Sequence, residues 1–208
     1  MAALQHVVLA MSPAETLRAA KAHPILFSGP MVRALLAGRK TQTRRVGSKP
    51  KYAVGDLLWV RESHYMTDDG YCGYAVFACD EQEVAYHFAE IDRAPYLKPE
   101  IKAEHKKLRP SIFLPKWASR LTLKVTDIKV ERVHEISDED AVAEGACFWS
   151  AETDEGYLAS DQVPRNDFAK LWDSINGKDR AKCWGANPWV IAYSFTVHER
   201  NVLEMMDG

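Results

Sequence analysis

The sequence lacks several features that would assign a function class at once. It has no excess of basic residues: 27 Lys and Arg face 29 Asp and Glu, for a formal net charge of −2. Dedicated binders of long nucleic acids usually carry a basic balance, so this composition argues against one. The sequence has no apolar run near the roughly 20 residues of a membrane-spanning helix, and its first residues lack the basic region of a secretory signal. We therefore expect a cytoplasmic protein without a membrane partner.

Cysteine is scarce as well, with four in 208 residues. They form no CxxC pair, and no histidine lies at metal-ligand spacing from them, so we expect no metal site and no cofactor. The sequence also has no glycine-rich phosphate loop, no HExxH pair and no Gly-x-Ser-x-Gly motif. These absences exclude the usual kinases, P-loop ATPases, Rossmann enzymes and zinc peptidases.

What is present is the composition of an ordinary globular protein, with 47% hydrophobic and 27% charged residues. Alternating apolar residues predict strands, and i, i+3, i+4 patterns predict short helices, without a regular βαβ rhythm. The pattern predicts an α+β protein: a small mixed or antiparallel β-barrel with short helices packed at its ends. The predicted strands are 25–27, 41–46, 57–62, 71–78, 84–88, 117–135 (with a bulge near Thr126-Asp127) and 189–197, and the predicted helices are 12–21, 28–38, 138–144 and 168–175.

The length predicts one domain rather than two. We place it at residues 25–198, after a peripheral helix within residues 1–24 and before a tail at residues 199–208. The segments near 64–110 and 146–165 lack clean periodicity over much of their length, and we interpret them as insertions.

The most unusual segment is Gly38-Arg39-Lys40-Thr41-Gln42-Thr43-Arg44-Arg45. Four of its eight residues are cationic, and their mutual repulsion favours the neutral form of a lysine among them. A neutral lysine beside a threonine hydroxyl is a base–nucleophile pair, although spacing alone favours a solvated basic turn. In an extended strand Lys40 and Thr43 would face opposite sides. They can converge only if Lys40 still lies in the turn after Gly38.

Glu144 is a second candidate, because it lies in the last turn of a predicted helix beside Gly145. The helix dipole disfavours a carboxylate there and raises its pKa modestly. Positions that break a local rule are often functional. An exposed glutamate on a frayed helix end is an equally good interpretation of this pattern.

Two pairs of an indole and a guanidinium could bind a nucleobase. Trp59 and Arg61 share one face of a predicted strand, and Trp117 lies close to Arg120 in the sequence. Aromatic and guanidinium groups stack on bases and hydrogen-bond to them. The alternative is that the tryptophans belong to the core and the arginines to its rim.

Several of these segments, in order, resemble one family. The motifs are Ile25–Gly29, Val32–Arg45, Gly55–Glu62, Pro115–Arg120, Glu144-Gly145 and Asn187–Val190. Together they resemble ASCH-domain proteins, of the longer type common in phages and prophages. This resemblance implies a PUA-like β-barrel with a cleft, a fold associated with RNA.

The resemblance also implies an activity. Small bacterial ASCH amidohydrolases remove the acetyl group from N4-acetylcytidine with a lysine and a threonine of a GRKTxT segment and a glutamate of a later helix. These roles fall on Lys40, Thr43 as nucleophile, and Glu144. The partner would be a modified nucleoside or base. Its further contacts are predicted at Arg45, Trp59, Arg61, Trp117 and Arg120.

Two questions stay open on the sequence. Lys40 could be the general base, or Glu144 could activate a water while protonated Lys40 stabilises the oxyanion. The chain could instead be an RNA-binding module or a ribonuclease that contacts phosphates through the cations of residues 39–51 and 98–124. A third alternative is a phage accessory protein that acts through a partner, and no motif in the sequence supports it.

Overall fold

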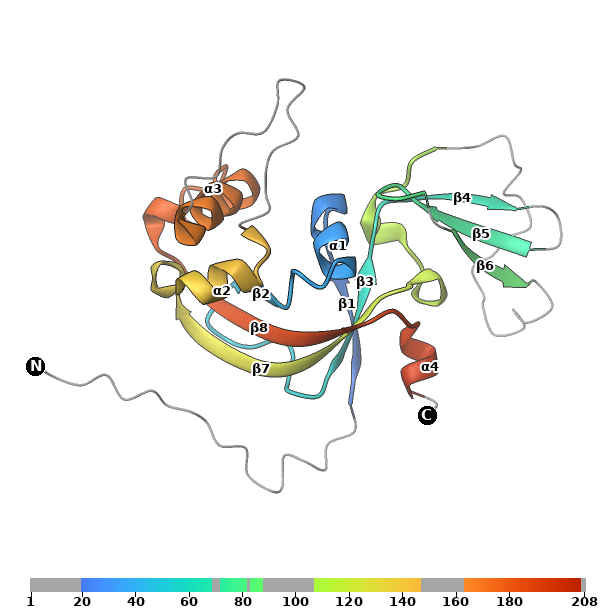
Figure 1. The fold of residues 1–208 in the computed structure, drawn as a ribbon, viewed down its shortest axis with the longest axis horizontal. Coiled ribbons are helices and arrows are strands. Elements are labelled where there is room, and N and C mark those ends of the chain that lie inside the picture. Colours follow the sequence, from blue (N-terminus) through green and yellow to red (C-terminus); the bar gives the residue numbers. More distant parts are fainter. Residues whose placement is uncertain (1–19, 69–71, 82, 88–106, 147–162, 207–208) are drawn as a thin grey trace, which may run out of the picture.

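The computed structural model describes residues 20–68, 72–81, 83–87, 107–146 and 163–206. Its main sheet has five strands in the order β1-β3-β7-β8-β2 (Figure 1). β1 runs parallel to β3, and the other neighbours are antiparallel, so the sheet is mixed. The strands are β1 (Ala22–Leu26), β2 (Gln42–Val46), β3 (Leu57–Arg61), β7 (Thr122–Arg132) and β8 (Trp189–His198).

The predicted α+β class is confirmed, but the sheet is not a closed barrel. β1 and β2 are its two edge strands, and no backbone ladder joins them in the described residues. A side chain joins the two edges instead, since Arg45 in β2 donates a hydrogen bond of 2.9 Å to the carbonyl of Leu26 in β1. At the seam, the gap between these two edge strands, the Phe27 ring lies 5.2 Å from the Arg45 guanidinium.

The two longest strands, β7 and β8, form the curved spine of the sheet (Figure 1). The predicted bulge is confirmed, because the register shifts between Val125 and Asp127. An extra residue in one strand bends it and increases its twist, and here it lies within the long curve of β7.

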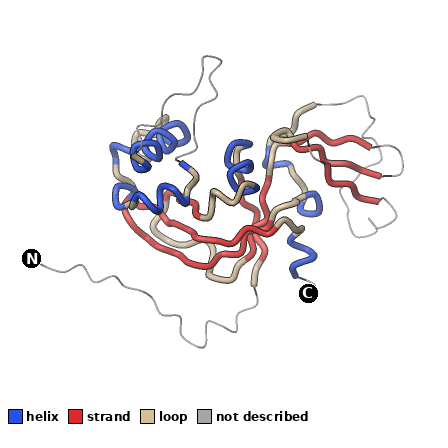
Figure 2. Tube along the Cα trace, in the orientation of Figure 1, coloured by secondary structure: helices blue, strands red, loops and turns tan. Residues whose placement is uncertain are grey.

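Helices cover the two ends of this sheet (Figure 2). The α-helices are α1 (Gly29–Leu36), α2 (Asp138–Ala143), α3 (Pro164–Asn176) and α4 (Val202–Met206), and the short 3-10 helices are η3 (Ser111–Phe113), η4 (Lys116–Ala118), η5 (Val133–Glu135) and η7 (Trp184–Ala186). α2 and α3 pack together at the end opposite to α4 (Figure 1). The predicted apolar face of α3 is confirmed at Phe168, Leu171 and Trp172, which are buried, whereas Ile175 is 59% exposed.

A second, three-stranded sheet projects at the far end from α3 (Figure 1). It consists of β4 (His64–Asp68), β5 (Cys72–Phe77) and β6 (Glu83–His87). The sequence predicted no strand between those at 57–62 and 71–78. The chain instead leaves β3 at Glu62, whose buried carboxylate is held by Arg120, and forms β4 first.

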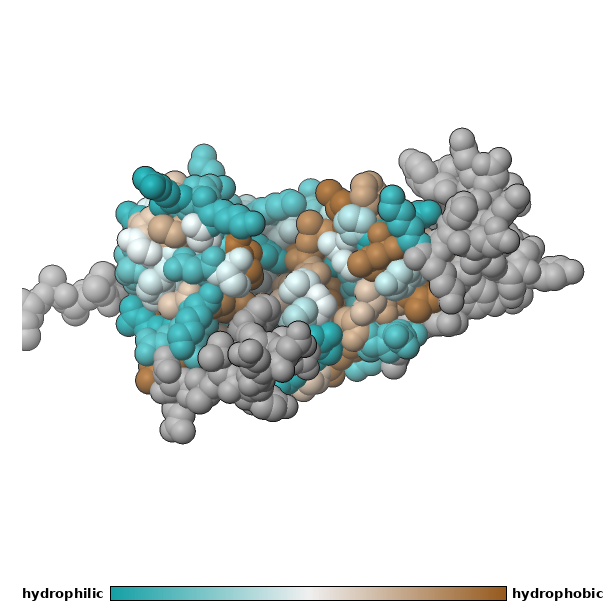
Figure 3. Space-filling model, turned by 90° about the horizontal axis from the view of Figure 1, so that it is seen from above, coloured by the Kyte–Doolittle hydropathy of each residue, from teal (hydrophilic) through white to brown (hydrophobic). Residues whose placement is uncertain are grey.

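The remaining segments complete the description. Residues 199–208, expected as a tail, contain α4, and Val202 of this helix is buried against Leu57 and Trp59. Most of the predicted helix at 12–21 lies outside the described residues, as do 88–106 and 147–162 of the predicted insertions. No helix in the described part of the chain is both long and apolar enough to cross a membrane. Apolar residues on the face seen from above are scattered among polar ones (Figure 3).

Candidate active site

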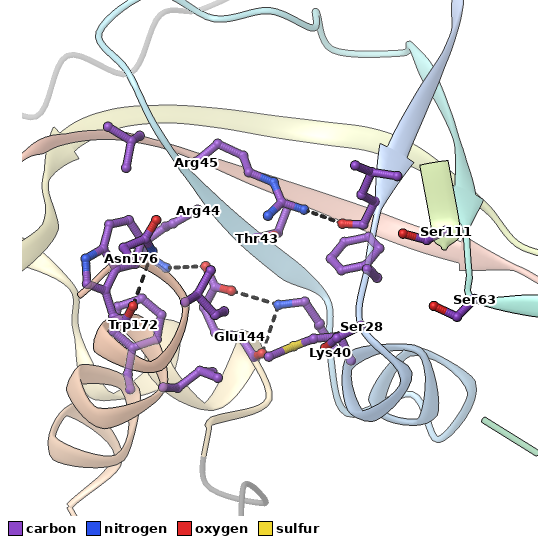
Figure 4. A pocket seen from close by; sticks show the side chains of 17 residues that line it. Ser28, Lys40, Thr43, Arg44, Arg45, Ser63, Ser111, Glu144, Trp172 and Asn176 are labelled. Carbon is purple, nitrogen blue, oxygen red and sulfur yellow. Dashed lines mark hydrogen bonds and ion pairs between the residues drawn. The ribbon is translucent and has the colours of Figure 1, made fainter. Parts of the chain in front are cut away.

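A cavity of about 420 Å³ lies where the two edges of the main sheet approach each other (Figure 4). Phe27, at the end of β1, lines one side, and Thr43 and Arg45 of β2 line the other. α3 contributes an apolar wall that includes Leu171 and Trp172. The seam that keeps the sheet from closing is therefore also the place where distant segments meet around an open space.

Lys40 reaches this cavity from the turn that follows α1. Gly38 has φ +67°, a conformation that glycine adopts without strain. The N–H groups of Arg39 and Lys40 then both donate to the carbonyl of Ala34, and β2 begins only at Gln42. Lys40 thus lies in the turn rather than in the strand, which is the condition under which it could share a site with Thr43. Both residues line the cavity.

Glu144 meets Lys40 from the end of α2. Lys40 Nζ donates a 2.7 Å hydrogen bond to Glu144 Oε2 and a 2.9 Å bond to the backbone carbonyl of Glu144. The neighbouring Gly145 has φ +80°, and a Cβ there would lie 3.4 Å from the Cβ of Ala34 and 3.6 Å from that of Lys40. Glycine therefore lets the end of α2 turn close against Lys40.

The surroundings of Lys40 favour loss of its proton. Burial is the largest cause and lowers its pKa below the usual 10.5, because the side chain is almost completely removed from water. Glu144 opposes this shift, whereas Arg45 and Arg44 add to it, and the net direction is downward. A neutral amine has two N–H groups and one lone pair. The two bonds to Glu144 use both N–H groups and leave the lone pair free to accept a proton.

Thr43 lies in the middle of β2, opposite Tyr193 of β8. Its side chain is 3% exposed and lines the cavity. The Thr43 hydroxyl makes no hydrogen bond to any residue that the structure describes, Lys40 included. It is therefore an unengaged hydroxyl in the same cavity as a lysine with a lowered pKa.

Arg44 lies on the opposite face of β2 from Thr43 and Arg45, and it also lines the cavity. The sequence indicated its charge near Lys40 but not its pairing with acidic side chains. Its side chain is fully buried and forms ion pairs with Glu131 (2.7 Å), Asp140 (2.7 Å) and Glu144 (3.3 Å). Burial alone would lower the pKa of its guanidinium, but the three carboxylates together raise it. Arg44 thus stays charged beside the Lys40–Glu144 pair.

The backbone of Arg44 also faces away from the sheet. Phe195 donates its N–H to Thr41, and Gly47 donates its N–H to Trp189, so alternate residues of β2 bond to β8. By this alternation Thr43 bonds to β8, and the N–H of Arg44 is directed to the free edge of the strand. The cavity lies at this edge, between the two edge strands.

Among the predicted substrate contacts, Arg45 lines the cavity, and Trp59 and Arg61 do not. Trp59 is buried on the other side of β3, against Leu57 and Val202. The Arg61 guanidinium stacks on the Trp59 ring at 4.3 Å and donates to the carbonyl of Ile112. In this pair, which was predicted to stack on a base, the guanidinium of Arg61 stacks on the indole of Trp59.

Trp117 and Arg120 are absent from the cavity as well. Trp117 packs against the small core around Phe77. Arg120 forms ion pairs with Glu62 and Asp80, both at 2.8 Å. Arg120 thus links the segment after β3 to the segment after β5, and Trp117 packs against the second sheet.

The aromatic residues that do line the cavity were not predicted there. Phe27 ends a strand motif, and Phe168 and Trp172 belong to the amphipathic face of α3. The period of that face predicts burial, but it does not show what the face covers. Of the basic stretch 39–51, Arg44 is fully buried in ion pairs, whereas Arg45 lines the cavity and donates to the carbonyl of Leu26.

No group of three or more His, Cys, Asp and Glu side chains that could hold a metal ion occurs within the described ranges. The candidate site thus consists of a lysine, a threonine, a glutamate and two arginines at the seam of the sheet. This set can transfer protons, supply a hydroxyl nucleophile and stabilise a negative charge.

Comparisons with known proteins give a distant likeness. No protein-family model matches the chain, and no curated protein does. One similar solved structure is a protein from Enterococcus faecalis V583 described by the family model DUF984, with a TM-score of 0.39, 10% identity, and coverage of 87% of this chain and 81% of that one. Another is an ASCH domain from Lactobacillus crispatus JV V101, with a TM-score of 0.38, 12% identity, and coverage of 90% and 86%.

Proposed function

We propose that this cavity hydrolyses the exocyclic amide of N4-acylated cytidine or cytosine. The observation that carries the proposal is the buried Lys40, whose pKa is lowered and which shares a cavity with the unengaged hydroxyl of Thr43. A hydroxyl is a weak nucleophile unless a nearby base removes its proton. The resemblance to the ASCH amidohydrolases supplies the substrate class.

In the first half of the reaction, neutral Lys40 takes the proton of Thr43 Oγ1. The oxygen attacks the amide carbonyl carbon, and the carbonyl electron pair moves onto the carbonyl oxygen. When this tetrahedral species collapses, the bond from carbon to N4 breaks, and the Lys40 ammonium returns its proton to the leaving nitrogen. Cytidine leaves, and the acyl group remains as an ester on Thr43.

In the second half, Lys40 takes a proton from a water molecule, whose oxygen attacks the ester carbon. The bond to Thr43 Oγ1 breaks, the hydroxyl regains its proton from Lys40, and the carboxylic acid leaves. Negative charge on the carbonyl oxygen develops next to Thr43 in both halves. The backbone N–H of Arg44, at the free edge of β2, is the nearest main-chain donor in sequence that could stabilise it.

The contacts of Glu144 favour an orienting role over that of the general base. Its Oε2 accepts from Lys40 Nζ, and its Oε1 accepts from Arg44 at 3.3 Å. A carboxylate with a hydrogen-bond donor on each oxygen, one of them the charged Arg44, is poorly placed to take a proton from water. We therefore assign the base to Lys40, and to Glu144 the task of holding it.

The walls of the cavity suit a flat, partly apolar substrate. Phe27, Phe168 and Trp172 offer aromatic surfaces to a pyrimidine ring. Arg45 and the hydroxyls of Ser28, Ser63 and Ser111 line the same cavity and can donate hydrogen bonds to polar edges of a nucleoside.

The test is the release of cytidine from N4-acetylcytidine by the purified full chain. We expect turnover by the natural protein, a loss of at least about 10³-fold in kcat for Thr43→Ala and for Lys40→Met, and retained activity in Thr43→Ser. Thr41→Ala is the matched control, because Thr41 lies in the same segment but is exposed and does not line the cavity. Unchanged turnover in Thr43→Ala or Lys40→Met, with folding confirmed by circular dichroism, would overturn the proposal.

A further inference from the structure

Arg44 links the cavity to two acidic side chains that lie outside it. Its guanidinium bonds to Glu131 Oε1 and Asp140 Oδ2, each at 2.7 Å, and to Glu144 Oε1 at 3.3 Å. Of these three carboxylates, Glu144 alone lines the cavity. Arg44 is therefore anchored by Glu131 and Asp140, and it bonds to Glu144 at the cavity (Figure 4).

Each oxygen of the Glu144 carboxylate contacts a different basic side chain. Oε1 contacts Arg44, and Oε2 contacts Lys40. The terminal torsion of a glutamate is broad and nearly two-fold, so a carboxylate held at one oxygen can still turn. With Arg44 fixed by two further ion pairs, the plane of the Glu144 carboxylate is set, and so is the direction from which Oε2 meets Lys40 Nζ.

The same contact affects the charge balance around Lys40. The charged groups that act on Lys40 are Glu144 from α2 and Arg44 and Arg45 from β2. α1 and α3 present apolar side chains to the cavity, among them Met31 and Leu171. Behind these groups lie Glu131 and Lys129 from β7, Asp140 from α2, and Tyr52 and Tyr193 beside Arg45.

A buried carboxylate paired with lysine alone would hold the proton on the amine. Here Glu144 interacts with Arg44 as well, and its negative charge is shared between two cations of which only one can lose a proton. The arginine stays protonated, because a guanidinium does not titrate in the accessible range. Lys40 is thus left as the member of the pair that can become neutral.

Resting on the proposed function, we propose that Arg44 is a positioning residue for the reaction: by holding Oε1 of Glu144 it orients Oε2 on Lys40 and compensates enough of the carboxylate charge for Lys40 to act as a base. Arg44 and Arg45 both line the cavity. All three guanidinium nitrogens of Arg44 are engaged with Gln42, Glu131, Asp140 or Glu144, so Arg44 acts through Glu144. Arg45 instead lies on the same face of β2 as Thr43.

The decisive variant is Arg44→Met, and Lys129→Met is its matched control. Lys129 binds Glu131 at 2.6 Å and Asp140 at 3.6 Å, so its removal takes one positive charge from the same cluster without touching Glu144. The titration of Lys40 is followed by the ¹³Cε chemical shift of labelled lysine, which requires no substrate. We expect the midpoint of Lys40 to move upward by about one pH unit in Arg44→Met and to stay unchanged in Lys129→Met. An unmoved midpoint in Arg44→Met overturns the inference.

A second variant separates orientation from charge and serves where Arg44→Met does not fold. Arg44→Lys keeps the charge but loses the planar fork that reaches three carboxylates. We expect an unchanged Lys40 midpoint, a kcat lowered on the order of tenfold or more, and a KM near that of the natural protein. An unchanged kcat in Arg44→Lys counts against a positioning role. If the natural protein turns over no N4-acylcytidine, the proposed function fails, and the titration still decides whether Arg44 controls Lys40.

Discussion

The Nζ of Lys40 lies 2.7 Å from the Oε2 of Glu144, although 104 residues separate the two in the chain. The same Nζ also caps the end of α2, because it donates a hydrogen bond of 2.9 Å to the backbone carbonyl of Glu144. Helix ends leave carbonyl groups without partners inside the helix, and buried ones need a donor. Lys40 therefore completes the fold at α2 and the candidate site at once. Changes near this contact should affect stability and activity by separable amounts.

Gly145→Ala should lower both stability and activity. Its φ of +80° strains any residue with a Cβ, whereas the contacts of that Cβ with Ala34 and Lys40, at 3.4 and 3.6 Å, are ordinary ones. We expect a loss of about 1–2 kcal/mol in the free energy of unfolding, measured by urea denaturation. Activity should fall further, because relief of the strain moves the end of α2, and Glu144 with it, away from Lys40.

Gly55→Ala is the control for this effect. Gly55 has φ +88° and nothing within 4 Å of an added Cβ, so it carries the same strain away from the site. We expect a similar loss of stability with kcat maintained. Equal losses of kcat in the two variants, once both are fully folded, would contradict the link between Gly145 and the site.

The stability of the protein should depend on pH through Lys40. Burial lowers its pKa in the folded state below the 10.5 of the unfolded chain. Between these two values the unfolded chain binds more protons, so the free energy of unfolding rises with pH across that window. The cost of burying the charged amine is present below the lowered pKa and disappears as the pH approaches 10.5. Lys40→Met lacks this dependence.

The measurement is the difference in unfolding free energy between the natural protein and Lys40→Met at several pH values. This difference should shift in favour of the natural protein as the pH is raised from neutrality toward 10.5, and then level off. A difference that is flat or falls over this range would show that the pKa of Lys40 is not lowered by folding.

Arg120→Met should reduce stability without weakening substrate binding. Its guanidinium holds the buried carboxylate of Glu62 through two hydrogen bonds, of 3.0 and 2.8 Å. Removal of one partner leaves a buried charge uncompensated, which costs about 3 kcal/mol. We expect a lower melting temperature and an unchanged KM for N4-acetylcytidine. Lys182→Met, at an exposed ion pair with Asp179, serves as the control and should change neither.

A raised KM in Arg120→Met, measured well below its melting temperature, would restore Arg120 to the substrate-binding residues that the sequence suggested. The same comparison can be made with Arg61, whose guanidinium rests on Trp59 outside the cavity.

Ile175→Trp should hinder access to the cavity. Ile175 lines it from α3 and is 59% exposed, so a larger side chain can reach the cavity without disturbing the core. We expect KM to rise several-fold with little change in melting temperature. Ser174→Trp, one residue earlier on α3 and not lining the cavity, should leave KM unchanged. Equal KM values in the two variants would place the substrate elsewhere.

Local patterns predicted the elements that depend on near neighbours in the chain. The bulge at Val125/Asp127 and the buried face of Phe168 and Trp172 follow from spacing alone, because strand and helix periods are local properties. The turn after Gly38 was predictable for the same reason, since its φ of +67° suits glycine. β4 was not predicted, because residues 64–68 lie in the segment that the sequence led us to interpret as an insertion. Its ladder with β5, from His64↔Phe77 to Asp68↔Gly73, is visible only in the structure.

The sequence by itself determined the α+β class, most of its strands and helices, and a short list of candidate residues that included Lys40, Thr43 and Glu144. Only the tertiary structure decided that Trp59 packs in an apolar cluster and that Arg120 pairs with Glu62. It also decided that Arg44 contacts Glu144 and that the main sheet stays open at the cavity. The physical reason is the sequence separation over which each interaction acts. Backbone geometry is set by neighbours within a few residues, whereas burial, ion pairing and a lowered pKa depend on which distant side chains the fold brings together.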